Sequence, residues 1–229
     1  MLVLNYPNSP TGKTATVDFY KRVIDFCQQH QIVVIQDAAH IMLSFDSPPL
    51  SFLSVDGALE VGVESHSLSK GFDMIGWRMG WVCGNERIVR AFSDVKDNTD
   101  SGQFIAIQKA AATALDDDGI PRAVAEKYQR RLEKLVSMLT RCGIPARMPG
   151  GTYFLYTPSP KRVSGGLTFD SAEAASQYLI TEHSICTVPW DDAGPFLRFS
   201  VTYEAGDASQ EDRLMAETES RLKEIAFEF

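Results

Sequence analysis

Four residues within a short segment have the types and the spacing to bind a phosphorylated cofactor and to attack it. Ser67, Ser69 and Lys70 lie within four consecutive positions, and Arg78 follows in a glycine-flanked turn. Serine hydroxyls and a forked guanidinium suit a phosphate dianion, and a nearby positive charge with partial burial favours the neutral, nucleophilic form of an amine. An amine nucleophile beside a phosphate anchor predicts a cofactor bound as a Schiff base. An isolated S-x-S-K segment more often carries a solvated surface lysine, but the arginine and its glycines favour the cofactor site.

A single aspartate, Asp37, follows the apolar, β-branched segment Ile32–Ile35. A carboxylate at the end of a buried strand can hold a protonated heteroaromatic nitrogen as an ion pair. Aspartate is also a favoured N-cap of a helix, and the residue alone favours neither interpretation. The lysine segment downstream favours the ion pair.

The hydrophobic pattern of the first half alternates between strands and helices. Such an order predicts a three-layer α/β/α sheet, in which ligands bind outside the carboxyl ends of the strands. Asp37 and Lys70 both follow a predicted strand directly. Strands are predicted at Met1–Leu4, Ile32–Ile35 and Leu59–Glu64, and helices at Val17–Gln29, Glu86–Val95, Gln103–Leu115 and Pro121–Leu139.

Beyond Gly143 the pattern changes to that of a smaller α+β domain. We therefore expect a partial cofactor-binding large domain at residues 1–120, and a connecting helix with a C-terminal small domain at residues 121–229. Strands are predicted at Tyr153–Thr157, Ile185–Val188 and Phe196–Thr202, and helices at Ser171–Leu179 and Gln210–Ala226.

Composition excludes several classes of function. The formal net charge is −8, so the chain offers no basic field for nucleic acid or for an anionic membrane surface. No apolar run approaches the roughly 20 residues that span a bilayer. The four cysteines form no C-x-x-C pair and no H-E-x-x-H segment is present, so neither a metal site nor a disulfide framework is predicted. These features predict a soluble, cytoplasmic protein.

Three longer segments resemble those of the fold-type I, pyridoxal 5′-phosphate-dependent aminotransferases of class I/II. They are residues 65–81, SHSLSKGFDMIGWRMGW, residues 94–104, DVKDNTDSGQF, and residues 187–194, TVPWDDAG. Within that family they are most similar to LL-diaminopimelate aminotransferase-like sequences. The resemblance covers almost the whole chain and implies the three-layer large domain, here incomplete, followed by the smaller α+β domain.

The resemblance assigns a role to each residue of the lysine segment. Lys70 is implied to form the Schiff base with pyridoxal 5′-phosphate and to move the substrate proton, and Asp37 to pair with the pyridinium nitrogen. Ser67, Ser69 and Arg78 are implied to bind the cofactor phosphate.

Further positions match the family with departures. Arg198 corresponds to the arginine that binds the substrate α-carboxylate, although alone it reads as an ordinary strand arginine. Residues 6–12 resemble the N-P-x-G turn of the family, in which the asparagine contacts the phenolic oxygen of the cofactor. Ser9 stands at the asparagine position in this chain, so the contact is implied for Ser9 or, if the turn is displaced by one residue, for Asn8. His40 stands where many members have a tyrosine bound to that oxygen; an interior histidine without this contact is the alternative.

The implied activity is transfer of an amino group between an amino acid and a 2-oxo acid, with LL-diaminopimelate and 2-oxoglutarate in lysine biosynthesis as the candidate pair, by a full-length homodimer. Three alternatives remain open: a carbon–sulfur β-lyase of the same fold, a non-catalytic cofactor-binding regulatory module, and an inactive fragment. Full-length relatives carry a long segment before the N-P-x-G turn, so we expect this chain to lack the N-terminal part.

Overall fold

The computed structural model describes residues 1–45, 48–100 and 102–229. The chain folds into two units. The first comprises Met1–Ser9, Lys13–Glu126 and Gly150–Thr152, and the second comprises Pro10–Gly12, Lys127–Pro149 and Tyr153–Phe229. The long helix α6, Gly119–Arg141, begins in the first unit and continues in the second. Among the described residues, no helix is both long and apolar enough to cross a membrane.

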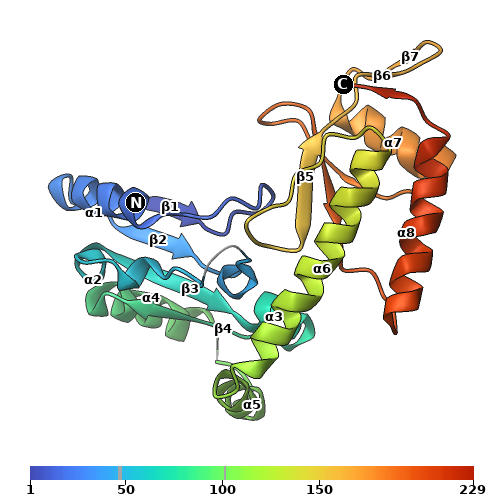
Figure 1. The fold of residues 1–229 in the computed structure, drawn as a ribbon. Coiled ribbons are helices and arrows are strands. Elements are labelled where there is room, and N and C mark those ends of the chain that lie inside the picture. Colours follow the sequence, from blue (N-terminus) through green and yellow to red (C-terminus); the bar gives the residue numbers. More distant parts are fainter. Residues whose placement is uncertain (46–47, 101) are drawn as a thin grey trace. The chain divides into compact units, whose positions relative to one another are not determined.

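The first unit is built on a four-stranded sheet with the order β1-β2-β3-β4 (Figure 1). β1, β2 and β3 are parallel, and β4 runs antiparallel to β3 at the edge. Asn5 pairs with Asp37, and Asp37 pairs with Ser65. The carboxyl ends of the three parallel strands therefore lie side by side at one end of the sheet. The strands are Leu2–Asn5, Val34–Asp37, Gly62–Ser67 and Gly80–Gly84.

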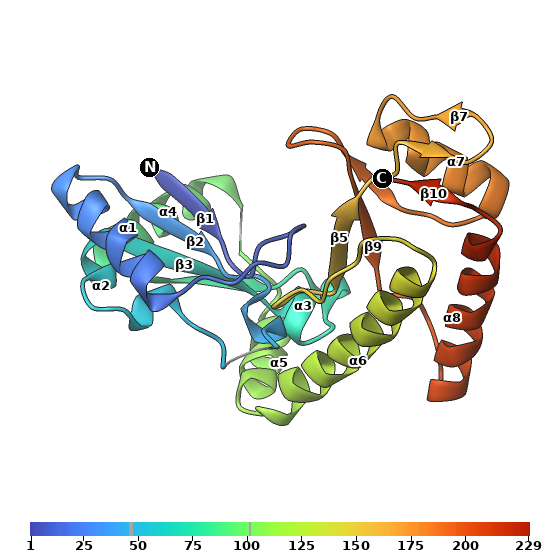
Figure 2. The same ribbon diagram turned by 45° about the horizontal axis from the view of Figure 1, so that its top comes forward.

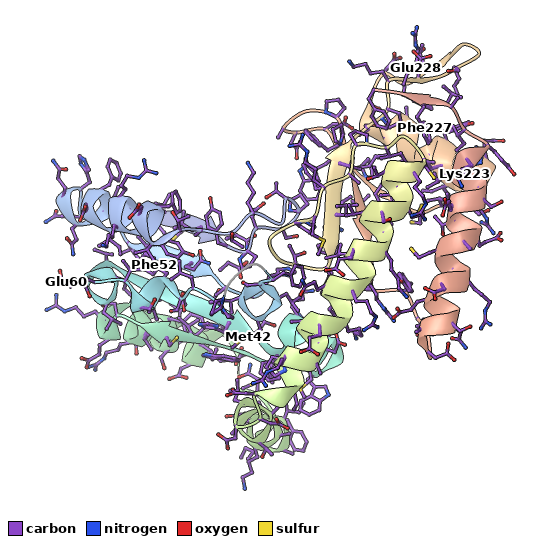
Figure 3. The ribbon with its side chains drawn as sticks, viewed as in Figure 1. Met42, Phe52, Glu60, Lys223, Phe227 and Glu228 are labelled. Atoms are coloured by element: carbon purple, nitrogen blue, oxygen red, sulfur yellow. The ribbon has the colours of Figure 1, made fainter. Side chains whose placement is uncertain are left out.

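One face of this sheet is covered by helix α1, Val17–Gln29, as the sequence predicted. Its buried residues Tyr20, Ile24 and Cys27 recur at helical spacing and pack against Phe52, which Figure 3 labels beside the sheet. The side chain of Thr16 caps the helix by accepting a hydrogen bond of 3.2 Å from the Phe19 N–H. The apolar stripe of α1 therefore fixes the helix on the sheet.

Helix α4, Glu86–Thr99, lies on the opposite face, as the two views of the ribbon show together (Figures 1 and 2). It starts directly after β4, with the Asn85 side chain accepting from the Arg87 and Ile88 N–H groups. Helix α5, Ile105–Leu115, follows. Helices on both faces confirm the predicted three-layer α/β/α architecture.

Three details of the predicted first half are wrong. The segment predicted as a strand at Leu59–Glu64 begins as a helical turn, α2, at Ala58–Val61, and β3 starts only at Gly62. A short apolar run does not distinguish a buried turn from a buried strand. The strand predicted at Ile32–Ile35 runs from Val34 to Asp37. Finally, strand β4 begins at Gly80, where the sequence predicted only a turn. The strand was missed because its pairing with β3 produces no hydrophobic pattern in the sequence around Gly80.

The second unit combines α6 with two further helices and two small sheets (Figure 2). Its main sheet has the antiparallel order β5-β9-β8, with β9 in the centre. The strand predicted at Ile185–Val188 begins only at Val188, and the second sheet, β10-β6-β7, was not predicted. The elements are β5 Phe154–Pro158, β6 Arg162–Val163, β7 Leu167–Thr168, α7 Ala172–His183, β8 Val188–Trp190, β9 Phe196–Ser200, α8 Ala208–Lys223 and β10 Phe227–Glu228.

Candidate active site

Lys70 lies in a single helical turn, α3, Leu68–Gly71, that begins where β3 ends. Ser67 is the N-cap of this turn, and its hydroxyl oxygen accepts a hydrogen bond of 3.0 Å from the Ser69 N–H. Gly71 closes the turn against Met42, which Figure 3 labels, because a Cβ at position 71 would lie 2.5 Å from the Met42 Cβ. The turn is therefore packed tightly against the segment that follows β2.

Arg78 lies near the start of this turn because β4 runs antiparallel to β3 and begins just after Arg78. The Leu68 N–H donates to the Met79 carbonyl oxygen at 3.2 Å, and Ser67 pairs with Gly80 in the sheet. Arg78 is exposed and adopts a left-handed backbone conformation, with φ of 52°, and one guanidinium nitrogen donates to the Ile75 carbonyl oxygen at 3.0 Å. Such a conformation is costly for a residue other than glycine and clusters at functional sites.

Asp37 ends β2 and does not cap a helix. Its Oδ1 accepts a hydrogen bond of 3.1 Å from the Ala39 N–H, within a turn. The next helix is a 3₁₀ helix at Ile41–Leu43, whose N-cap is His40. The helix-cap interpretation of Asp37 is therefore wrong. His40 is buried and lies directly after this turn, so the structure places it at the same strand end.

Asn5 and Gln36 hold the turn that contains Asn8 and Ser9 against the end of β2. Neither residue was singled out from the sequence. Asn5 Nδ2 donates to the Asp37 carbonyl oxygen at 3.0 Å, while Asn5 Oδ1 accepts from the Ser9 N–H at 2.8 Å and from Asn8 Nδ2 at 3.4 Å. Gln36 Nε2 donates to the Tyr6 carbonyl oxygen at 2.7 Å. Polar residues at the ends of apolar strands were the available signal for both.

A cavity of about 440 Å³ lies beside Arg78 within the first unit. The His66 ring stacks on Trp81 there, with centroids 5.1 Å apart, and His66 Nε2 lies 3.0 Å from the buried Glu64 carboxylate. Lys70 and Asp37 are not among the described residues that line this cavity, and Arg78 is the one predicted site residue that is. The lining residues are Ser65, His66, Arg78, Gly80, Trp81, Val82, Phe92, Val95, Lys96, Thr99, Asp100 and Gln103.

The donor set at the strand ends suits a phosphorylated pyridine aldehyde. The ends of β2 and β3 carry one carboxylate, one primary amine and two serine hydroxyls, and one guanidinium stands just before β4. These groups match a ring nitrogen, an aldehyde carbon and a phosphate in number and charge. The residues concerned are Asp37, Lys70, Ser67, Ser69 and Arg78.

Arg198 belongs to the second unit and lies in the central strand β9, paired with Tyr156 on one side and Val188 on the other. Its guanidinium carbon lies 4.0 Å from the centroid of the Phe154 ring and 5.7 Å from that of Trp190. Burial lowers the pKa of Arg198 from its ordinary value. A guanidinium group stays protonated in proteins, so Arg198 is a cation.

The family model for aminotransferase class I and II matches residues 1–215, and the chain belongs to this family, which depends on pyridoxal 5′-phosphate. Two relatives, the LL-diaminopimelate aminotransferases of Methanocaldococcus jannaschii and Methanococcus maripaludis, are each 50% identical over 100% of this chain and 56% of their own length. The chain thus spans about half the length of these relatives.

Solved structures agree with this assignment. The substrate-bound BacF structure from Bacillus subtilis has a TM-score of 0.88 and 30% identity, covering 99% of this chain and 56% of that chain. An aminotransferase from Staphylococcus aureus has a TM-score of 0.84 and 26% identity, covering 96% of this chain and 57% of that chain. The expected α/β aminotransferase fold is therefore confirmed.

Proposed function

We propose that the protein transfers an amino group between an amino acid and a 2-oxo acid, using pyridoxal 5′-phosphate bound at Lys70. The observation that carries this proposal is the tight turn with Ser67, Ser69 and Lys70, joined through the β3–β4 hairpin to Arg78, beside the strand that presents Asp37. The candidate pair is LL-diaminopimelate with 2-oxoglutarate, in lysine biosynthesis, because relatives with 50% identity over this whole chain carry that activity in their names.

Each residue contributes one chemical function to this reaction. When bound, the cofactor supplies an electrophilic carbon and an electron-withdrawing ring. The Lys70 amine is the nucleophile and, once free, the base that moves the proton of the substrate Cα. The Asp37 carboxylate holds a proton on the ring nitrogen, and Ser67, Ser69 and Arg78 bind the phosphate.

The remaining predicted residues bind the ring oxygen and the substrate. Ser9, Asn8 and His40 lie at the strand ends and offer hydrogen-bond donors to the phenolic oxygen of the cofactor. Arg198 binds the α-carboxylate, which amino acid and 2-oxo acid share, because a planar guanidinium binds a carboxylate bidentately. The proposal includes a homodimeric full-length protein in the cytoplasm. The names of the relatives favour this reaction over a carbon–sulfur β-lyase.

Borohydride trapping tests the cofactor site directly. The 229-residue chain is incubated with pyridoxal 5′-phosphate, scanned for absorbance, reduced and mapped by mass spectrometry. We expect one dominant pyridoxyl adduct, on Lys70, which Lys70→Ala abolishes. The matched control is Lys96→Ala, which removes a partly exposed lysine paired with Asp100 and should keep the adduct. Adducts scattered over surface lysines, unchanged in Lys70→Ala, would contradict the proposal.

Substrate assays separate the reaction classes. Glutamate formed from LL-diaminopimelate and 2-oxoglutarate supports the proposed pair. Release of thiol and pyruvate from cystathionine, without transfer of an amino group, would instead establish the β-lyase.

A further inference from the structure

The sheet face that carries Arg198 in the second unit is aromatic. Residues paired directly across antiparallel strands share a face, and alternate residues of one strand do as well. The opposite face carries Leu155 and Leu197, which are 1% and 2% exposed and belong to the core. Five side chains on the first face are half-buried, and four of them are aromatic: Phe154, Tyr156, Trp190, Phe196 and Arg198.

Two of these rings hold the guanidinium from neighbouring strands. Phe154 lies on β5 with its ring centroid 4.0 Å from the Arg198 guanidinium carbon, and Trp190 lies on β8 at 5.7 Å. Aromatic faces attract a guanidinium through cation–π interaction, and stacked rings accept no hydrogen bonds from its edge. Phe154 and Trp190 therefore fix the position of Arg198 while leaving its N–H groups available.

Arg198 is a cation that the protein itself does not neutralise. Within the described residues, its buried Nε has no hydrogen-bond partner and no carboxylate forms an ion pair with it. Arg131, also buried and also stacked on a ring, contrasts with it: it donates to Glu211 at 2.8 Å and to the carbonyl oxygens of Val201 and Tyr203. The buried Arg131 is thus paired with a carboxylate inside the fold, whereas Arg198 is not and can bind an external anion.

We propose that Phe154 and Trp190 are positioning residues that set the affinity of Arg198 for the substrate carboxylate. They hold the guanidinium in one plane and shield it from water, so that a planar carboxylate meets a preorganised, weakly hydrated fork. This inference rests on the proposed function, because it takes Arg198 as the ligand of the α-carboxylate. Since both substrates carry that group, loss of either ring raises the KM for amino acid and 2-oxo acid by the same factor and leaves kcat unchanged.

The same face offers a matched control. Phe196 stacks on Tyr156, with centroids 4.5 Å apart and planes 13° apart, and among the described residues the rings in cation–π contact with Arg198 are those of Phe154 and Trp190. Phe196→Leu therefore removes the same kind of side chain from the same face as Phe154→Leu, without removing a ring from the guanidinium.

The test measures carboxylate binding without cofactor or turnover. Phenylglyoxal modification of Arg198 in the 229-residue chain is followed by mass mapping at increasing maleate concentrations. We expect Phe154→Leu and Trp190→Leu each to raise the half-protecting maleate concentration about tenfold, in line with a desolvated cation–π contact. Phe154→Tyr and Trp190→Phe should restore most of the affinity, and Phe196→Leu should stay within about twofold of the wild type.

Two outcomes would overturn the inference: no protection of Arg198 by maleate in the wild type, or equal protection in the wild type and both leucine variants. Thermal unfolding of each variant identifies any that misfold. If a leucine variant misfolds, the affinity of Phe154→Tyr or Trp190→Phe for maleate is compared with that of the wild type instead. The inference and the proposed function can fail independently. A chain that binds maleate as expected but catalyses no amino transfer would refute the proposed reaction and leave the role of Phe154 and Trp190 intact. Where transfer occurs, parallel rises in both KM values with unchanged kcat support the positioning role.

Discussion

Glu211 on α8 is the residue whose replacement should destabilise the second unit most. It is 3% exposed, and its carboxylate accepts hydrogen bonds from Arg130 at 2.9 Å, Arg131 at 2.8 Å and Lys134 at 3.2 Å. All three cations lie on α6, so this carboxylate joins the two helices. Glu211→Gln keeps the shape of the side chain and removes its charge.

The cost follows from what the change leaves behind. Arg131 is 5% exposed, and without Glu211 its charge is buried with no counter-ion. Removing one partner of a buried ion pair costs about 3–5 kcal/mol. The pKa gives a similar figure. Burial by itself would raise the pKa of Glu211, but hydrogen bonds from Arg130, Arg131 and Lys134 outweigh it and lower the pKa from 4.5 to about 2, which corresponds to about 3 kcal/mol.

The sign of the pH dependence is fixed by that direction. A carboxylate whose pKa is lower in the folded state stabilises the fold above its unfolded pKa, and this stabilisation is lost as pH falls through the folded pKa. The contribution of Glu211 is therefore complete above pH 4.5 and declines toward pH 2. Wild type and Glu211→Gln should differ most at neutral pH and converge in acid.

Urea unfolding, followed by circular dichroism at pH 7 and again in acid, measures this difference without the ionic screening of a guanidinium salt. Glu219→Gln is the matched control, because the side chains of its partners Arg141 and Lys223 are 53% and 57% exposed, and ion pairs with exposed partners contribute little. At neutral pH we expect Glu211→Gln to lower the free energy of unfolding by about 3–5 kcal/mol. A loss below about 1 kcal/mol, or the same loss in both variants, would refute the importance of the buried pair.

Three further substitutions test the candidate site. Asp37→Asn should retain pyridoxal 5′-phosphate in absorbance titration but lower single-turnover transamination about a hundredfold or more; unchanged turnover would defeat its assignment. Gln36→Leu should cost about 1–3 kcal/mol in denaturant unfolding and weaken cofactor binding, whereas Gln28→Leu, at an exposed position, should do neither. Gly71→Ala should cost about 1–3 kcal/mol through overpacking, and Gly76→Ala, with open space around its Cα, should be nearly neutral; equal losses in both would argue against the close packing.

Local pattern was enough to predict part of this fold. Helix α1 was predicted with its observed bounds, because Tyr20, Ile24 and Cys27 repeat at helical spacing. The segment Leu59–Val61 was misassigned as strand, since three residues are too few to show a helical or a strand period. Strand β4 was missed because its pairing with β3 joins residues that no sequence pattern connects.

The same distinction applies to the candidate site. Ser67 and Lys70 were predicted from a local motif. Asn5 and Gln36 were not, because their partners lie across the strand register, on segments up to 32 positions away. The contact of Phe154 with Arg198 depends in the same way on the pairing of β5 with β9. Sequence reasoning therefore singled out the candidate ligand-binding residues more readily than the residues that hold them in place.

The antiparallel strand β4 explains why the spacing of lysine and arginine matters. Parallel strands alone would send the chain away from Lys70 after α3, but β4 pairs Gly80 with Ser67 and so returns Arg78 to the start of the lysine turn. A Cβ at position 80 would lie 2.5 Å from the His66 carbonyl oxygen, so a glycine is needed for this close pairing. The arginine is thus placed by the length of the connecting hairpin as much as by its own type, and an insertion between α3 and β4 should displace it even with every functional side chain intact.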